Sequence, residues 1–170
     1  AFVDWDADAG VAGARAFAAF WAWLSELRAA CAERGLTLRA YCWHETAENG
    51  WLRRGAEATG VDADDVERFI GSEQWVDLLK VFRRQVITGY GNLLKVVAPL
   101  LGFAWADEDP SGGSSMLWWR DAVDPDVTPA AREVARTRLL AYNADDVRAT
   151  LHVREWLDRE GPTLREVPRG

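Results

Sequence analysis

Cysteine is scarce in this chain, which contains only Cys31 and Cys42 among its 170 residues. The two are not spaced as a CxxC pair, so the sequence indicates neither a disulfide framework nor a redox motif. No signal-like segment opens the chain, and no apolar run approaches the ~20 residues that span a bilayer. We therefore expect a soluble, cytoplasmic protein in a reducing setting, with no membrane partner.

Basic residues are also fewer than acidic ones. The chain has 20 Lys and Arg against 27 Asp and Glu, which gives a formal net charge of -7. Tight, sequence-independent binding to a phosphate backbone usually needs a basic surface. If nucleic acid is the ligand, we expect its contacts to be local, metal-assisted or shared with another domain.

Hydrophobic residues, by contrast, are plentiful. They make up 49% of the sequence, and 170 residues are enough for one domain with a substantial core. We therefore expect residues 1–170 to form a single domain. The ten tryptophans suit either a large aromatic core or a stacking surface, and the helical spacing of Trp21 and Trp23 favours packing.

Strand-like and helical segments follow one another along the chain, which is the order of an α/β protein. The predicted strands cover residues 1–5, 36–43 and 75–82. The predicted helices cover residues 14–34, 46–58, 61–70, 92–101 and 129–160, the last one redirected near Tyr142 and Asn143. Loops are predicted at 6–13 and 106–115, and Gly35 and Gly102 are placed just after helix ends.

The stretch YNADDV (142–147) puts polar residues inside an apolar helical pattern. Asn143 could cap a new helix, with Asp145 and Asp146 in its first turn, where carboxylates accept backbone N–H groups. That interpretation leaves the tyrosine unexplained. If the helix is continuous, Tyr142 and Asp146 lie four residues apart on one face, where a phenol could orient a water beside a carboxylate-bound metal. Both interpretations stay open.

A second polar group follows the predicted strand 36–43. His44, Glu45 and Glu48 lie where active groups collect in α/β sheets, at the carboxyl end of a strand. HETAE is similar to the zinc motif HExxH, but Glu48 replaces the second histidine, so a zinc protease is disfavoured. The alternative is a helix start with an acidic first turn.

Asp77 is the one acidic residue in the β-prone run 75–82. A buried carboxylate needs a partner or a cation. Asp77 could lie on a solvent-exposed face, accept backbone bonds at a strand end, or face the same cleft as Glu48.

Two other chemistries have little support. Ser114 or Ser115 could in principle act with His44 or His152 in a hydrolase triad, but the chain contains no GxSxG motif. The glycines of SGGSS have no following lysine, and GYG is an isolated turn, so neither predicts a phosphate-binding loop.

Glu48, the WVDLL run and the late Tyr142-x-x-x-Asp146 occur in the order used by DEDD-type 3′–5′ exonucleases of the RNase H-like fold, whose tyrosine variant ends in YxxxD. The similarity extends to AYCWHETAENGWL, FIGSEQWVDLL, LLKVVAPLLGFAW, SMLWWRDAV and LLAYNADDVRATLHVREWL. Together these segments resemble the C-terminal RNase H-like region of TM0106-type RecB-family nucleases. The resemblance covers nearly the whole chain.

This resemblance implies a helix-rich, three-layer α/β fold of the RNase H type. It also implies a nuclease that uses two Mg²⁺ or Mn²⁺ ions to hydrolyse phosphodiester bonds of DNA or RNA. Asp146 would bind metal, Tyr142 would orient the attacking water, and Glu48 would occupy the second acidic motif, where Asp is more usual. His44, Asp77 and Asp145 would be accessory residues.

The family's first motif, a strand carrying Asp-x-Glu, has no clear match. Asp4 and Asp6 could stand in for it, but the helix that follows resembles what comes after the family's third strand. We therefore expect an N-terminally truncated fragment, inactive alone, whose partners are a nucleic-acid end or single strand and an upstream nuclease domain. The alternatives are a non-catalytic module of the same fold that binds nucleic acid or protein, and an unrelated helical interaction domain.

Overall fold

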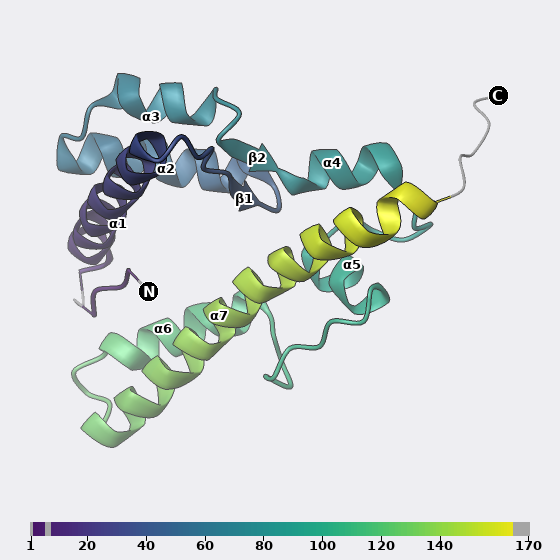
Figure 1. Ribbon diagram of the computed structural model, residues 1–170. Helices are drawn as coiled ribbons and strands as arrows, with labels where there is room; N and C mark the ends of the chain where they lie inside the picture. Colours follow the sequence, from purple (N-terminus) through teal and green to yellow (C-terminus); the bar gives the residue numbers. More distant parts are fainter. Residues whose placement is uncertain (1, 6–7, 165–170) are drawn as a thin grey trace.

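The computed structural model describes residues 2–5 and 8–164. Within these ranges the elements are α1 (Ala9–Glu33), β1 (Ala40–Cys42), α2 (Glu45–Thr59), α3 (Ala63–Ile70), β2 (Trp75–Asp77), α4 (Leu78–Gln85), α5 (Leu94–Leu100), α6 (Gly112–Val123), α7 (Pro129–Glu160) and the 3₁₀ helix η1 (Gly161–Thr163). The long helix α7 crosses the molecule, with α6 along its first half and α5 beside its second half (Figure 1). None of the described helices is both long enough and apolar enough to cross a membrane.

The sheet consists of β1 and β2, which are parallel, with Ala40 opposite Trp75 and Cys42 opposite Asp77. The Ala40 N–H donates to the carbonyl of Gln74 at 2.7 Å. Helices α2 and α3 make the crossover that a parallel pair requires. This βαβ unit is compatible with the predicted α/β class, although the three layers of an RNase H fold stay a prediction, and it brings the carboxyl ends of the two strands side by side.

Three apolar clusters hold the described helices together, and the smallest, of Trp118, Leu139 and Tyr142, joins α6 to α7. Of the other two clusters, the first joins α1 to α2 and α3 and contains Phe17, Trp21, Leu24, Leu52, Ala56, Val66 and Phe69. The second joins the strand ends to α4, α5 and α7 and contains Trp43, Leu78, Leu79, Phe82, Val97, Ala98, Ala149, Val153 and Leu157. Because Trp43 directly follows β1 and shares a cluster with α7, the carboxyl end of the sheet packs against that helix.

The periodicity-based helices are confirmed, with small shifts of their ends. Gly35 and Gly102 have positive φ angles of 65° and 94° just after α1 and α5, as glycines that end helices do. Trp21 packs in the core as expected. Trp23 does not, since 46% of it is exposed.

Several predicted strands and loops are wrong. Residues 2–5 form no strand, and helix α1 begins at Ala9, inside the predicted loop, because the Asp8 carboxylate accepts the N–H of Gly10 at 2.8 Å. The first residue and the loop's residues 6–7 lie outside the described ranges. The predicted strand 36–43 is reduced to Ala40–Cys42, and α6 begins at Gly112 within the predicted loop 106–115.

The predicted strand 75–82 is a strand for three residues and a helix afterwards. The carboxylate of Asp77 accepts the N–H of Lys80 at 3.1 Å, which makes Asp77 the N-cap of α4. The apolar residues that follow pack on a helical face, with Leu78, Leu79 and Phe82 all buried. The capping residue Asp77 therefore marks the point at which the strand ends and the helix begins.

Helix α7 is not redirected near Tyr142 and Asn143. It runs unbroken from Pro129 to Glu160 and is capped at its start by Thr128, so Asn143 caps nothing. Its buried positions keep helical spacing through the polar stretch, from Leu139 and Tyr142 to Ala149 and Val153. The helix continues because the polar residues on this face find partners on neighbouring elements.

Candidate functional site

Asp77 links the starts of two helices at the carboxyl end of the sheet. It is 8% exposed, and besides the Lys80 N–H its carboxylate accepts the N–H of Glu45 at 3.3 Å. Of the three placements that the sequence leaves open for Asp77, the structure has it accepting backbone bonds at a strand end. A carboxylate at two helix N-termini is favoured by both helix dipoles.

Glu48 lies on α2, one turn after the exposed His44 that precedes the helix. Its Oε2 atom is buried and has no hydrogen-bond partner. Burial is the main cause that raises the pKa of the Glu48 carboxyl, and the negative charge of Asp77 adds to it, while His44 acts in the opposite direction. His44 and Asp77 thus both lie close enough to Glu48 to influence its charge.

Acidic side chains also surround Cys42, at the carboxyl end of β1. Burial, followed by the charges of Glu48, Asp77 and Glu45, raises the pKa of the Cys42 thiol to about 12. Cys42 is therefore a neutral, unreactive thiol at physiological pH. The Lys80 ammonium offsets part of this charge through an ion pair with Glu45.

Tyr142 and Asp146 meet on one face of α7, as their four-residue spacing predicts. Tyr142 is 7% exposed. Its burial and then the charge and hydrogen bonding of Asp146 raise the pKa of the Tyr142 phenol to about 12. The phenol therefore stays protonated at neutral pH and acts as a hydrogen-bond donor beside the carboxylate.

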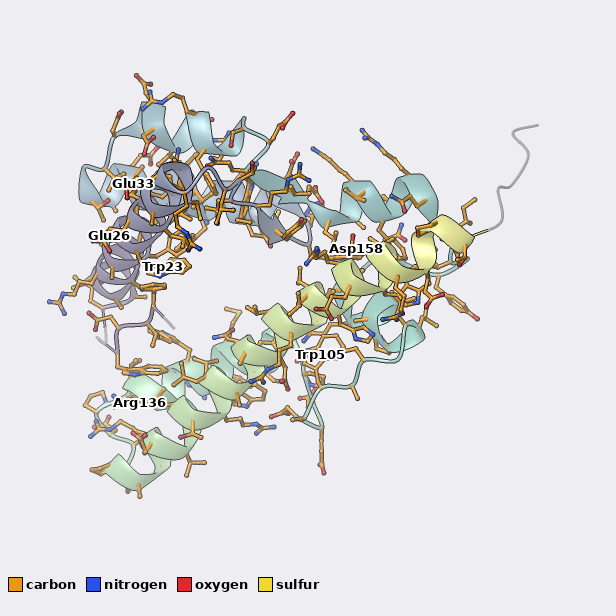
Figure 2. The ribbon with its side chains drawn as sticks, in the orientation of Figure 1. Trp23, Glu26, Glu33, Trp105, Arg136 and Asp158 are labelled. Carbon is orange, nitrogen blue, oxygen red and sulfur yellow. The ribbon has the colours of Figure 1, made fainter. Side chains whose placement is uncertain are left out.

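Asp146 is also held from outside its own helix. The Lys95 ammonium from α5 pairs with its Oδ1 atom, and the Trp105 indole N–H donates to the same atom at 2.8 Å. The Lys95 nitrogen lies 4.0 Å from the centroid of the Trp105 ring and 4.4 Å from that of Tyr142. We call Lys95, Trp105, Tyr142 and Asp146 the Lys95 cluster; Trp105 lies alongside α7 (Figure 2).

Asp145 has a different set of partners. It is 8% exposed and accepts the Ala106 N–H at 2.9 Å, and it pairs with Arg148 at 3.0 Å. The Ala106 N–H, followed by Arg148, holds the pKa of the Asp145 carboxyl below its usual range. The two adjacent aspartates thus hold two consecutive residues, Trp105 and Ala106, against α7.

Sequence reasoning missed Lys95 and Trp105. They are separated from Asp146 by 51 and 41 residues, so no local spacing connects them. The one available signal was Lys95 itself, a charge in the otherwise apolar helix LKVVAPL.

A protein-family model of the RNase H superfamily, RNase_H_2, matches residues 38–158, well over half of the chain. The chain belongs to the RNase H superfamily. Searches of curated proteins and of solved structures found no match. Glu48, Asp77, Tyr142 and Asp146 all lie within the matched segment of this RNase H superfamily member. The family is consistent with a nuclease or with a module that binds nucleic acid.

Divalent metal is the cofactor that the RNase H resemblance implies, and two observations fit it. Carboxylate oxygens are the ligands that Mg²⁺ and Mn²⁺ prefer. Glu48 offers a buried carboxylate oxygen without a partner, and Asp146 already holds a cation, the Lys95 ammonium. However, residues 2–5 and 8–164 contain no group of three or more His, Cys, Asp or Glu that could hold a metal ion. The described part of this RNase H domain thus offers two partial positions and not a complete two-ion centre.

The remaining candidates find other partners. Asp4 pairs with Arg15 at 3.2 Å in a segment that is not a strand, and Asp6 lies outside the described residues. Ser114 bonds to Asp109, and His152 is within hydrogen-bond distance of the Leu101 carbonyl, 2.9 Å away. These contacts give no support to a serine triad in this RNase H superfamily chain.

Proposed function

We propose that this chain is part of a metal-dependent 3′–5′ exonuclease of the RecB type that hydrolyses phosphodiester bonds at DNA or RNA ends. The observation that carries the proposal is the pairing of Tyr142 with Asp146. A protonated phenol and a carboxylate share one helix face, in the YxxxD spacing, within a member of the RNase H superfamily. The two Mg²⁺ or Mn²⁺ ions of such an enzyme would activate a water and neutralise the charge of the phosphate.

Tyr142 and Asp146 have distinct roles in this proposal. Asp146 would provide a carboxylate oxygen to a metal ion. With its O–H donated to Asp146, Tyr142 would accept a hydrogen bond from the attacking water and orient it, and it would not act as a base, because its pKa of about 12 keeps the phenol protonated. Trp118 holds the Tyr142 ring in place, since it packs edge-on against that ring with the two centroids 5.7 Å apart.

Glu48 is proposed as the carboxylate of the second acidic motif, with His44 and Asp77 as accessory residues. Its unpartnered Oε2 and the neighbouring Asp77 charge both favour a cation there. A centre with two ions needs further carboxylates, and we propose that an upstream segment carries the Asp-x-Glu motif, next to a separate nuclease domain. In this view residues 1–170 alone bind metal weakly and do not cleave.

The large exposed surface is compatible with such an upstream partner. The accessible area is 10946 Å², compared with about 8400 Å² for a compact protein of this mass. Part of this surface is aromatic, because Phe2, Trp23 and Trp51 are each at least 40% exposed. Aromatic surface of this kind often belongs to an interface.

The decisive experiment measures Mn²⁺-dependent release of nucleotides from a 3′-labelled single strand by a chain that includes the upstream residues. Asp146→Asn should abolish release, because the amide loses the negative charge that holds the metal. Asp158→Asn is the matched control on the same helix, where Asp158 pairs with Arg154 at 2.7 Å, and it should retain activity. Release that survives Asp146→Asn would remove Asp146 from the metal site.

A non-catalytic module is the second candidate, and one observation favours it. Both aspartates of the motif have partners that explain them structurally, namely Lys95 and Trp105 for Asp146 and Ala106 for Asp145. This candidate predicts that the extended chain binds a fluorescent single-stranded oligonucleotide without cleaving it. Binding would be equal in wild type and Asp146→Asn, and Mn²⁺ would have no effect on it.

A further inference from the structure

Helix α4 ends in a pair of exposed arginines. Arg83 and Arg84 lie in its last turn, and within residues 2–5 and 8–164 neither of them forms an ion pair. By contrast, Lys80, one turn earlier on the same helix, pairs with Glu45. In a chain with a net charge of -7, two adjacent guanidinium groups without a paired carboxylate make a local site of positive charge.

The connection that follows α4 exposes three large apolar side chains. Ile87, Tyr90 and Leu93 are each at least 70% exposed. Tyr90 is the most exposed aromatic residue of the described ranges, and its ring packs against no other ring there. Exposed apolar side chains gathered on one segment are typical of an interaction surface.

This segment is anchored at both ends to the carboxyl end of the sheet. It begins at Asp77, which ends β2 and caps α4. Near its other end, the carbonyl of Asn92 accepts the indole N–H of Trp43, which directly follows β1, at 3.0 Å. Because β1 and β2 are neighbours in the parallel sheet, the two anchors lie close together. Residues 78–92 therefore leave from and return to the strand ends where the candidate acidic residues lie, and α4 extends directly from β2 (Figure 1).

The two arginines are held at a short, fixed distance from these strand ends. They follow Asp77 by six and seven residues, which is about 10 Å along a helix axis. The opposite face of α4 is buried in the core through Leu79 and Phe82, so the helix cannot turn its arginines inward.

We propose that residues 83–93 bind single-stranded nucleic acid, with Arg83 and Arg84 on its phosphates and Tyr90 stacked on a base. A guanidinium group matches the geometry of a phosphate, and an aromatic ring stacks on any base. A purely apolar partner would leave the two arginines without counter-charge, which favours a ligand that is both anionic and aromatic. This inference deepens the proposed function by naming where the strand binds, and it rests on that function for the class of ligand.

Chemical-shift mapping on the whole chain tests this surface in the absence of metal. The ¹⁵N-labelled protein is titrated in EDTA with short oligothymidylate and oligouridylate strands. The amide signals of residues 83–93 should move most, and the strand that binds more tightly tells whether DNA or RNA is preferred. No movement of these signals with either strand, or a larger movement on another face, would overturn the inference.

Fluorescence anisotropy with the same strands measures the contribution of the arginines. In Arg83→Ala/Arg84→Ala, the plot of log K against log salt should become shallower by about 1.4, or roughly 0.7 for each lost phosphate contact. Arg34→Ala/Arg54→Ala is the matched control, because it removes the same charge from two other exposed arginines that form no ion pair in the described ranges. The control should keep the slope of wild type.

The stacking role of Tyr90 has its own pair of variants. Tyr90→Ala should weaken binding about tenfold, as the loss of one stacked base does. Tyr90→Phe keeps the ring and should bind as wild type does. Binding by Tyr90→Ala as tight as that of wild type would overturn the stacking role.

The outcomes separate this surface from the proposed function. Strand binding at residues 83–93 without Asp146-dependent cleavage by the upstream-extended chain would support the surface and overturn the nuclease. Asp146-dependent cleavage that is unaffected by Arg83→Ala/Arg84→Ala and by Tyr90→Ala would do the reverse. An equal loss of binding in the two double variants would show a general effect of charge. Shifts at residues 83–93 that follow protein concentration alone would assign the surface to a second copy of the chain, and either result would overturn the inference.

Discussion

The indole N–H of Trp105 donates to Asp146 at 2.8 Å, across 41 residues of sequence. The next residue, Ala106, donates its backbone N–H to Asp145 at 2.9 Å. The two carboxylates therefore act first as anchors that fix one segment of the α5–α6 connection on α7. The proposed catalytic role of Asp146 would therefore use a side chain that these contacts already hold in place.

Removing the Asp145 anchor should destabilise the domain. Asp145→Ala removes a buried carboxylate that accepts the Ala106 N–H, and the loss of a hydrogen bond to a charged group should lower the free energy of unfolding by about 1–3 kcal/mol. Urea denaturation measures it. Asp158→Ala, at an exposed position on the same helix, should cost less than about 0.5 kcal/mol. Equal losses in the two variants would show that Asp145 anchors nothing.

Helices α1 and α2 approach closely at Gly55. A Cβ atom there would lie 2.2 Å from the Phe17 ring, so Gly55→Ala forces the helices apart. The gain in helix propensity, about 1 kcal/mol, is smaller than the overpacking, and we expect a net loss of about 1–3 kcal/mol. Gly13→Ala in α1 is the control, because a Cβ there meets nothing within 4 Å. Thermal unfolding should show Gly13→Ala as stable as wild type or more so, and stabilisation by Gly55→Ala would refute the close packing.

Asp77 should matter as an acceptor more than as a charge. Asp77→Ala removes the acceptor for the N–H groups of Lys80 and Glu45 and should cost about 1–2 kcal/mol, as the loss of an N-cap does. Asp77→Asn keeps the oxygen that caps Lys80 but not the one that accepts from Glu45, so it should recover part of this loss in a chemical denaturation experiment. If Asn is as damaging as Ala, the negative charge and not the cap is what Asp77 supplies.

The ion pair between Asp107 and Arg138 should make stability depend on pH in the acid range. Arg138 donates to both carboxylate oxygens and holds the pKa of the Asp107 carboxyl down to about 2. A depressed pKa stabilises the fold above the unfolded value of about 3.9, and this contribution is lost as the pH falls through about 2. Wild type should therefore exceed Asp107→Asn in melting temperature at about pH 6 but not below about pH 2. A difference that persists in strong acid would contradict the assignment.

Glu48 should make the stability of the fold depend on pH in the opposite direction to Asp107. Its pKa is raised by burial, so the folded state gains stability from the protonated form at low pH and loses it as the pH rises through the folded value. Glu48→Gln should therefore be more stable than wild type at neutral pH, by less than about 1 kcal/mol because the group is partly screened. The advantage should disappear below about pH 4. Mg²⁺ should raise the melting temperature of wild type and not of Glu48→Gln, and an equal rise in both would exclude Glu48 as a ligand.

Local signals in the sequence predicted most helices because their apolar residues repeat at helical spacing. The strand 75–82 was mispredicted for a different reason, since its β-prone composition hides the cap at Asp77 that begins a helix. Asn143 looked like a cap, but a cap forms only where a helix begins, and tertiary partners keep α7 continuous through it.

The candidate site was predictable only in part. The spacing of Tyr142 and Asp146 is a property of one helix, so the sequence revealed their contact. Lys95 and Trp105 come from other elements and reach Asp146 only through the tertiary fold. Whether Glu48 and Asp146 act in one site remains a prediction, because the described residues do not gather a complete set of metal ligands.

The central claim is that Tyr142 and Asp146 work together on a water in a metal-dependent nuclease. Single-turnover release of nucleotides by the upstream-extended chain carrying Tyr142→Phe tests it most directly, because this change removes the hydroxyl and keeps the ring that packs on Lys95 and Trp118. We predict a rate about 100-fold lower, as for the loss of a group that positions a reactant, with unchanged Mn²⁺ affinity. An unchanged rate in Tyr142→Phe would contradict the account.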